Sequence, residues 1–236
     1  MNWLTDTAKT QIRQFACEHP EEETCGFVLT DGAVVRAPNK ATDRANEFEI
    51  CPHDFATYEE HILGVWHSHL TLAGFSPLDQ QVMASDTTPW AVYCLADDSW
   101  HECNPAEVAP FEGRPFVFGV YDCYSLVTDY LDQKGVALPQ WKRKQWGEWN
   151  TAGFTPFDDE WSKVGKSIKP GDQQAGDILL LNLGDVPMHT DHVGVFTDRK
   201  RFLHHPSEGQ SRIQTFGSYW ERRLNWIVRP FELCKS

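Results

Sequence analysis

Two histidines one residue apart end the apolar segment ILGVWHSH at residues 62–69. Alternate side chains of a strand share a face, so His67 and His69 are expected to face a single metal ion. Further along the chain, Ser76 is a residue type that caps helices, and Asp79 follows it in what would be the first helical turn. Two imidazoles and one carboxylate can bind a tetrahedral zinc ion and leave its fourth position to water.

A zinc-bound water also needs a general base, and an acidic stretch earlier in the chain provides one. In the stretch EEETCGF, Glu23 is the last of three glutamates and comes directly before a segment typical of a strand. Glu23-Thr-Cys-Gly, His-Ser-His and Ser-x-x-Asp, in this order, resemble the JAB/MPN (JAMM) metalloprotease signature over roughly residues 1–103. The resemblance implies these roles: general base Glu23, zinc ligands His67, His69 and Asp79, and oxyanion-binding hydroxyl Ser76.

The loop between the second histidine and the serine is one residue shorter than in that family. It is LTLAGF, residues 70–75, and begins with leucine, whereas the family usually has a longer loop that commonly begins with proline. A His-x-His on a strand is by itself most often a pair of ordinary histidines. The order of Glu23, His-x-His and Ser-x-x-Asp favours descent from a metal site, with retained or lost cleavage as alternatives.

A second set of residues suited to catalysis lies in the other half of the chain. Cys123 follows Asp122 at a predicted helix start, where free backbone N–H groups and the helix dipole favour the nucleophilic thiolate. The other six cysteines lie in strand-like, loop or terminal contexts typical of buried thiols. His192 in HVGVF is the expected base, and His204 in FLHHP can orient it.

These segments, together with AGDILLL, resemble the NlpC/P60 family of cysteine peptidases over about residues 113–236. The resemblance implies nucleophile Cys123, base His192 and orienting residue His204, with Tyr121 near the nucleophile. A small shift in alignment would exchange His189 for His192. Only one of His204 and His205 can face the base, because neighbours in a strand point to opposite faces. Four tryptophans lie between nucleophile and base, either as packing or as a platform for sugars and peptides: Trp141, Trp146, Trp149 and Trp161.

Composition bounds the class of protein. The chain has 236 residues, enough for two domains with cores of their own, and its hydrophobic fraction of 41% fits a globular protein. A formal charge of -13 repels phosphate backbones and argues against nucleic acids and anionic membrane surfaces as partners. No signal peptide or membrane span is expected, and the seven cysteines, without a Cys-x-x-Cys pair, predict reduced thiols.

The sequence segments around the first set of residues predict a mixed sheet with helices. Apolar residues recur at helical spacing from Trp3 to Ala16, and Pro20 ends that helix. Strands are expected at CGFVLT, AVVRAP, FEICP, ILGVWHSH, PWAVYCLA and SWHECN, with a helix capped by Ser76 before the last two. The proline-rich segment 104–115 predicts a linker.

The overall prediction is an α+β protein of two domains. The first, residues 1–106, is expected to be JAB/MPN-like. The second, residues 107–236, is expected to be NlpC/P60-like and papain-like, with a helix from Asp122 to a stop at Gly135 and then an antiparallel sheet. Its strands are predicted at AGDILLLNL, HVGVFTD, KRFLHHP, RIQTF and NWIVRPFE.

A JAB/MPN-like half followed by an NlpC/P60-like half resembles the tail tip assembly protein K family of phages with long, non-contractile tails. Local matches are GRPFVFGVYDCYSLV, AGDILLL, and LHH followed by GSYW. The resemblance implies tail-tip assembly and hydrolysis of amide bonds in peptidoglycan stem peptides, with those peptides and other tail-tip proteins as partners. The expected locations are the host cytoplasm during assembly and the virion tail tip, acting at the host periplasm and cell wall. The alternatives are a non-catalytic tail-tip component with vestigial sites, and an isopeptidase for ubiquitin-like tags, which would explain only the first half.

Overall fold

The chain folds into two compact units, Met1–Glu107 and Val108–Ser236. A computed structural model describes residues 3–139, 156–184 and 189–234. Both units combine helices with a sheet, which confirms the predicted α+β class. In the described ranges, no helix is long and apolar enough to cross a membrane. The assignment of the first unit to the JAB/MPN type stays a prediction.

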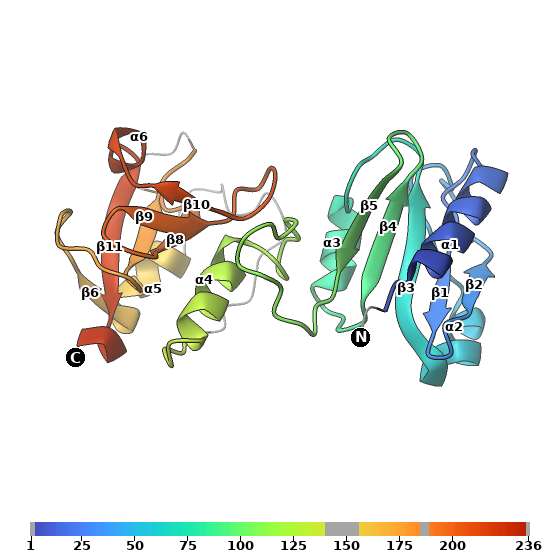
Figure 1. The fold of residues 1–236 in the computed structure, drawn as a ribbon, viewed down its shortest axis with the longest axis horizontal. Coiled ribbons are helices and arrows are strands. Elements are labelled where there is room, and N and C mark those ends of the chain that lie inside the picture. Colours follow the sequence, from blue (N-terminus) through green and yellow to red (C-terminus); the bar gives the residue numbers. More distant parts are fainter. Residues whose placement is uncertain (1–2, 140–155, 185–188, 235–236) are drawn as a thin grey trace. The chain divides into compact units, whose positions relative to one another are not determined.

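Unit 1 is built on a five-stranded sheet in the order β2-β1-β3-β4-β5 (Figure 1). β3 and β4 run parallel, and the other neighbours run antiparallel. The elements are α1 (Asp6–Glu18), β1 (Cys25–Leu29), β2 (Val34–Ala37), α2 (Pro52–Tyr58), the 3₁₀ turn η1 (Glu59–His61), β3 (Ile62–His69), α3 (Pro77–Met83), β4 (Trp90–Cys94) and β5 (Ser99–Cys103).

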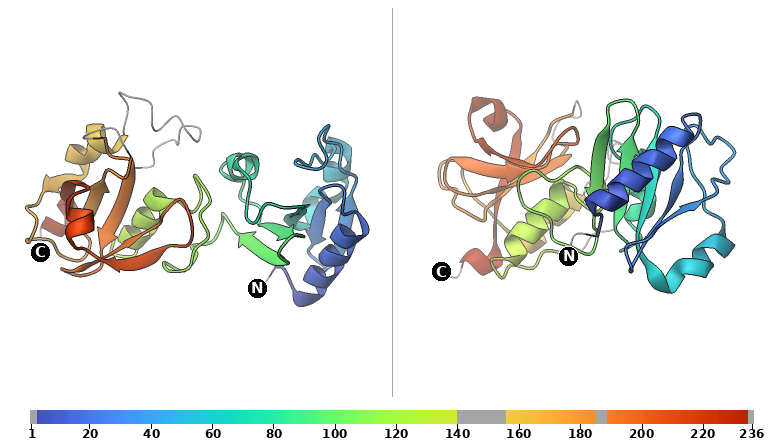
Figure 2. Two further views of the ribbon diagram at one scale, coloured as in Figure 1. Left: turned by 90° about the horizontal axis from the view of Figure 1, so that it is seen from above. Right: turned by 45° about the vertical axis from the view of Figure 1, so that its right-hand side comes forward.

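Helix α1 covers one face of this sheet, as Figures 1 and 2 show. Thr5 caps the helix by accepting a hydrogen bond from the Ala8 backbone N–H at 3.2 Å. The buried side of α1 packs against Trp66 of β3 and its neighbours on β1 and β4. Because side chains alternate along β3, His67 and His69 point to the opposite face. Helix α1 therefore covers the face opposite to the histidines, and α2 and α3 lie on the histidine face.

The segment FEICP, predicted as a strand, is not one, and this part of the prediction is wrong. Asn39 holds the segment as a loop: its amide donates to the Glu47 carbonyl at 2.9 Å and its oxygen accepts from the Glu49 N–H at 3.1 Å. Cys51 then caps α2, with Pro52 at the first helical position, so the chain turns into a helix that the sequence analysis did not predict.

Unit 2 is an antiparallel six-stranded sheet in the order β10-β9-β8-β7-β11-β6. All five predicted strands are present, and the structure adds β6, α5 and α6. The elements are α4 (Cys123–Asp132), α5 (Pro156–Val164), β6 (Gly165–Ser167), β7 (Ile178–Leu181), β8 (His192–Phe196), β9 (Arg201–His204), β10 (Arg212–Thr215), α6 (Ser218–Glu221), β11 (Leu224–Pro230) and the 3₁₀ turn η3 (Phe231–Cys234).

Helix α4 begins and ends as predicted. Asp122 and Ser125 form a reciprocal capping box at its start, and Gly135 takes a positive φ of 72° just past its end. Leu126 of α4 belongs to the same buried apolar cluster as Val193 of β8. The packing of α4 on β8 therefore brings the helix that starts with Cys123 against the strand that starts with His192.

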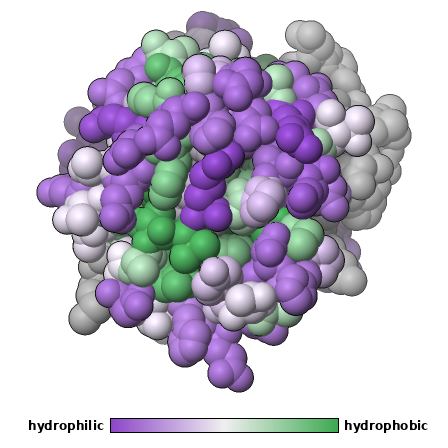
Figure 3. All heavy atoms as spheres, turned by 90° about the vertical axis from the view of Figure 1, so that its right-hand side faces the viewer, coloured by the Kyte–Doolittle hydropathy of each residue, from purple (hydrophilic) through white to green (hydrophobic). Residues whose placement is uncertain are grey.

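Hydrophilic side chains dominate the face of unit 1 seen in Figure 3, with a smaller hydrophobic group near the middle of the view. This distribution agrees with a formal charge of -13 over 236 residues. The face offers a mostly polar surface to its surroundings.

A buried arginine ties the start of unit 2 to α4. The Arg114 side chain is fully buried and donates to the Asp129 carboxylate at 2.6 Å and to the Pro110 carbonyl at 2.8 Å. Its guanidinium lies 5.4 Å from the Phe111 ring centroid and 5.6 Å from that of Tyr121. The Arg114 guanidinium keeps these partners only while the segment around Pro110 stays packed against α4.

We expect the substitution Arg114→Met to destabilise unit 2 by about 2–3 kcal/mol. Methionine keeps the apolar stem but leaves the Asp129 carboxylate and the Ala109 and Pro110 carbonyls without their donor. Hydrogen exchange of α4 peptides, followed by mass spectrometry, measures the change. Arg201→Met is the matched control, because Arg201 pairs with Asp198 at the surface. Equal exchange of α4 in both variants would contradict the role given to Arg114.

Candidate functional sites

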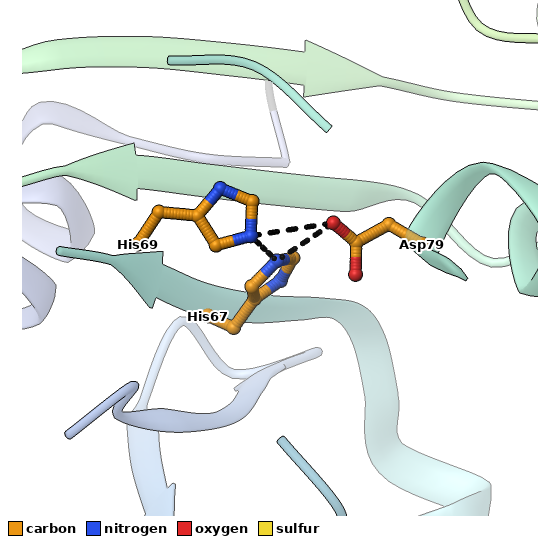
Figure 4. Close-up of side chains that lie close together, drawn as sticks. All are labelled: His67, His69 and Asp79. Atoms are coloured by element: carbon orange, nitrogen blue, oxygen red, sulfur yellow. Dashed lines mark hydrogen bonds and ion pairs between the residues drawn. The ribbon is translucent and has the colours of Figure 1, made fainter. Parts of the chain in front are cut away.

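The structure brings together the three predicted zinc ligands in unit 1 (Figure 4). The Nε2 atoms of His67 and His69 lie 3.1 Å apart, and each lies 3.3 Å from Oδ2 of Asp79. Ligands about 2.0–2.1 Å from a tetrahedral zinc ion lie about 3.3–3.4 Å from one another. The donor atoms therefore have the types and the separations that a zinc ion requires.

Helix α3 carries Asp79 to this place. Ser76 caps the helix as predicted, and with Asp79 it forms a capping box: the Ser76 hydroxyl accepts from the Asp79 N–H at 3.2 Å, and Asp79 Oδ2 accepts from the Ser76 N–H at 2.7 Å. Pro77 occupies the first helical turn. The shorter loop at residues 70–75 still lets the strand and the helix converge.

Neighbouring groups fix the orientation of both rings. Nδ1 of His69 lies 3.1 Å from the Leu72 carbonyl, so its hydrogen points away from the site and Nε2 keeps its lone pair. The ring of His67 is fully buried and stacks on Phe48 at a centroid distance of 4.4 Å. The sequence pattern gave no signal for Leu72, because a backbone carbonyl is supplied by any residue type.

Glu23 lies beside the three ligands, with Oε1 3.6 Å from Nε2 of His69. Ser68, the residue between the two histidines, positions it: the Ser68 hydroxyl accepts from the Thr24 N–H at 2.9 Å, and the Ser68 N–H donates to the Thr24 carbonyl. The middle residue of His-Ser-His therefore anchors the segment before β1 that carries the predicted base. This contact was missed from sequence.

Burial and charge act in opposite directions on these side chains. Burial raises the pKa of Glu23 to about 7. Burial also lowers the pKa of His67, whereas for His69 the hydrogen bond to Asp79 and the charge of Glu23 outweigh burial and raise the pKa. The two imidazoles hold the pKa of Asp79 well below its usual range despite its burial. A neutral imidazole beside ionised Asp79 is the state in which a metal binds.

A pocket of about 200 Å³ opens next to Glu23 and Asp79. Its walls combine apolar side chains with carboxylates and one hydroxyl: Glu23, Asn46, Glu47, Phe48, Ser76, Leu78, Asp79, Val82 and Trp90. Leu78 and Val82 are exposed and lie one turn apart on α3. The pocket therefore combines apolar walls with a few polar groups, as ligand-binding pockets commonly do.

In unit 2 the predicted base and its orienting residue are in contact. Nε2 of His192 lies 3.0 Å from Nδ1 of His204, and the rings are nearly perpendicular, with an interplanar angle of 88°. Both histidines are buried, and Trp220 lies against His204 at a centroid distance of 5.0 Å. Cys123 is the first residue of α4 and packs, partly buried, against the main apolar cluster. The pairing of Cys123 with His192 stays a prediction.

The neighbouring histidines have different surroundings. His205 is buried with Nε2 3.2 Å from the Pro115 carbonyl and Nδ1 3.1 Å from the Pro206 carbonyl, so His204 is the residue that faces the predicted base. His189 is buried three residues before His192. Trp161 stacks on Trp226 at 5.0 Å, which fits packing. Trp141, Trp146 and Trp149 lie outside the described residues.

The segment that leads into His192 is held by side chains that the sequence analysis did not single out. The Thr190 N–H donates to the Asp158 carboxylate at 2.9 Å, and the Asn225 amide donates to the Thr190 hydroxyl at 3.0 Å. Asp191 accepts from the backbone N–H groups of Leu183 and Gly184, each at 2.7 Å. Helix α5 and strand β11 therefore fix the approach to β8. Isolated Asp, Thr and Asn residues give no pattern that would predict this.

Comparison with known proteins bears mainly on the second unit. A model of the NlpC/P60 family matches residues 113–229. This part of the chain is similar to that family. The match supports the predicted class of activity, a cysteine-dependent hydrolase. It does not extend to the first unit, so the JAB/MPN-like assignment of residues 1–106 stays a prediction.

Two related proteins are named tail tip assembly protein K. The protein of Escherichia phage N15 is 28% identical over 222 residues, which cover 91% of this chain and 90% of that protein. The protein of Escherichia phage lambda is 28% identical over 183 residues, 75% of this chain and 87% of that protein. The predicted kinship with this family is confirmed. Among solved structures, a Staphylococcus aureus protein of the NLP/P60 family, described as similar to lipoprotein, is 23% identical with a TM-score of 0.37, over 51% of this chain and 37% of that one.

The histidine pair is expected to make unit 2 sensitive to acid. Burial lowers the pKa of His192 to about 3 and that of His204 to about 4. Between these values and the unfolded pKa of about 6.5, the unfolded chain binds protons that the folded pair does not, so stability falls as the pH falls. Each histidine that stays neutral when folded accounts for a loss of about 2 kcal/mol between pH 7.5 and pH 5.

Hydrogen exchange of β8 peptides at both pH values, corrected for the intrinsic exchange rate, measures this loss. His204→Gln should reduce the pH dependence by about half, because one of the two titrating groups is gone. His53→Gln is the control, because His53 is exposed in unit 1. The expectation fails if His204→Gln has the pH dependence of the wild type.

Proposed function

We propose that this chain is a phage tail-tip assembly protein whose second unit hydrolyses amide bonds in peptidoglycan stem peptides through Cys123. The observation that carries the proposal is the buried contact between His192 and His204 within a unit of the NlpC/P60 family. The two relatives named tail tip assembly protein K support the role in the tail. Other tail-tip proteins are then its assembly partners.

In the proposed reaction, His192 takes the proton of the Cys123 thiol and the thiolate attacks the scissile carbonyl carbon. The positive end of the α4 helix dipole stabilises the thiolate, and the backbone N–H of Cys123 can bind the oxyanion. His192 then gives its proton to the leaving amine, and an acyl-enzyme remains on Cys123. Water attacks the acyl carbon with His192 as base, which releases the acid and restores the thiol.

Mass spectrometry of purified peptidoglycan fragments, incubated with the full chain, tests this activity. We expect the wild type to cut and Cys123→Ala to lose at least about 10³-fold in rate, because no other group supplies the nucleophile. Cys234→Ala is the matched control, since among the described residues its thiol donates to the backbone carbonyls of Arg229 and Pro230. If wild type and Cys123→Ala leave the fragments equally intact, the alternative of a non-catalytic tail-tip component with vestigial sites replaces this proposal.

We propose further that unit 1 is a JAB/MPN-like zinc metallopeptidase acting on a tail protein during assembly in the host cytoplasm. The observation in favour is the convergence of His67, His69 and Asp79 within 3.3 Å. When bound there, zinc would supply an activated water and a Lewis acid. Glu23 would hold and move the proton of that water. The Ser76 hydroxyl accepts its cap bond as an oxygen and keeps its hydrogen to donate to an oxyanion.

The metal content of the full chain, expressed with added zinc and measured by plasma mass spectrometry, tests the zinc site. We expect about one zinc ion per chain in the wild type and a loss of most of it in His67→Ala, because two ligands hold zinc far more weakly than three. Glu23→Gln should keep the metal and abolish processing of the tail protein. His53→Ala is the control for a histidine outside the site. A wild type that is free of zinc after this preparation would contradict the proposal.

A further inference from the structure

One hydrogen links the two histidines of unit 2. Both rings are buried and neutral near pH 7, so each carries a single N–H. The contact between Nε2 of His192 and Nδ1 of His204 holds one of these hydrogens. Whichever ring donates it fixes the tautomer of both rings.

Only one of the two arrangements leaves a base. Nε2 of His192 is already engaged by His204, so Nδ1 is the nitrogen left to accept a thiol proton. Nδ1 has a lone pair only if the hydrogen of His192 is on Nε2 and is donated to His204. The hydrogen of His204 is then on its own Nε2, where it needs an acceptor.

His204 Nε2 is buried and has no completed hydrogen bond in the described ranges of the chain. A buried N–H without an acceptor is unfavourable, so the ring pair by itself would adopt the opposite arrangement. In that arrangement His192 carries its hydrogen on Nδ1 and cannot act as a base. An acceptor near His204 Nε2 is therefore required for the arrangement that leaves His192 a base.

Strand β10 places Gln214 near that nitrogen. In the β9–β10 register, Arg212 lies opposite His204 and Gln214 lies opposite Phe202, so the four side chains share a face. A glutamine diagonal to His204 is long enough to reach its ring. Hydrogen bonding by the Gln214 side chain also acts to raise the pKa of His204, as an acceptor oxygen does, although burial dominates and the net shift is downward.

The other charged or titratable groups that act on His204 are Arg212 and His205. Arginine has no acceptor atom. Both ring nitrogens of His205 face the carbonyls of Pro115 and Pro206. Among the described side chains named here as acting on His204, Gln214 is the one with an oxygen to offer.

We propose that the side-chain oxygen of Gln214 accepts the Nε2 hydrogen of His204 and so holds His192 in the tautomer with a free Nδ1 lone pair. Gln214 is then a positioning residue, two rings away from the thiol. The inference rests on the proposed hydrolase function for its purpose, but the tautomers themselves can be observed without any substrate.

Long-range ¹H–¹⁵N correlation of histidine rings in the full chain at pH 7.5 reads the tautomers directly. We expect the Nε2–H form for both His192 and His204 in the wild type. Gln214→Leu removes the acceptor and should convert both rings to the Nδ1–H form. Gln214→Glu keeps an acceptor oxygen and should retain both Nε2–H forms. Wild-type rings already in the Nδ1–H form, or rings unchanged in Gln214→Leu, would overturn the inference.

Activity gives the second readout. Gln214→Leu should lower kcat for peptidoglycan cleavage by about 10²-fold or more with little change in KM, and Gln214→Glu should restore most of it. Thr215→Val is the control, because Thr215 is exposed and its side chain points to the other face. If the rings behave as expected and neither the wild type nor any variant cleaves peptidoglycan, the inference about the tautomers holds and the hydrolase proposal fails. If Gln214→Leu does not fold, the comparison of wild type with Gln214→Glu decides, because a carboxylate only accepts.

Discussion

Imidazole rings buried side by side impose the main physical constraint on this chain. In unit 1 the two Nε2 atoms of His67 and His69 lie 3.1 Å apart, and in unit 2 Nε2 of His192 lies 3.0 Å from Nδ1 of His204. A ring removed from water loses its tendency to carry charge and has to find its hydrogen bonds within the protein. The Leu72 carbonyl meets this requirement for His69, whereas His67 Nδ1 and His204 Nε2 have no hydrogen-bond partner among the described residues.

The surroundings of the two pairs give them different chemistry. Around the first, Asp79 and Glu23 add two carboxylates within 3.6 Å of His69, so the buried group attracts a cation. Around the second, burial and the charges of Arg212 and His205 lower the pKa of His204 and so favour a neutral ring. Two neutral imidazoles are suited to moving a proton, whereas two imidazoles beside carboxylates are suited to holding a metal ion. One local arrangement therefore supports two kinds of site within a single chain.

Local patterns in the sequence predicted most of the fold, because helix caps and strand segments depend on nearby positions. The His-x-His on a strand, Ser76 as a helix cap and Asp122 before Cys123 are of this kind. The failures came from contacts distant in sequence. Asn39 overrode the strand-like composition of FEICP through hydrogen bonds to its backbone. The sequence analysis assigned no role to Ser68 or Gln214, because only the strand register reveals what they face.

The capping box of α3 has a consequence for the time course of the first site. The hydrogen bond from the Ser76 N–H to Asp79 both starts the helix and aims the carboxylate at the histidines. Helix α3 spans Pro77–Met83, and so short a helix has little stability of its own. Its first turn opens by local fraying far more often than the central strand β3 separates from its neighbours. Each opening removes the Asp79 carboxylate from the site while the two imidazoles stay in place. The rate at which a bound metal ion exchanges would therefore follow the lifetime of this single helical turn.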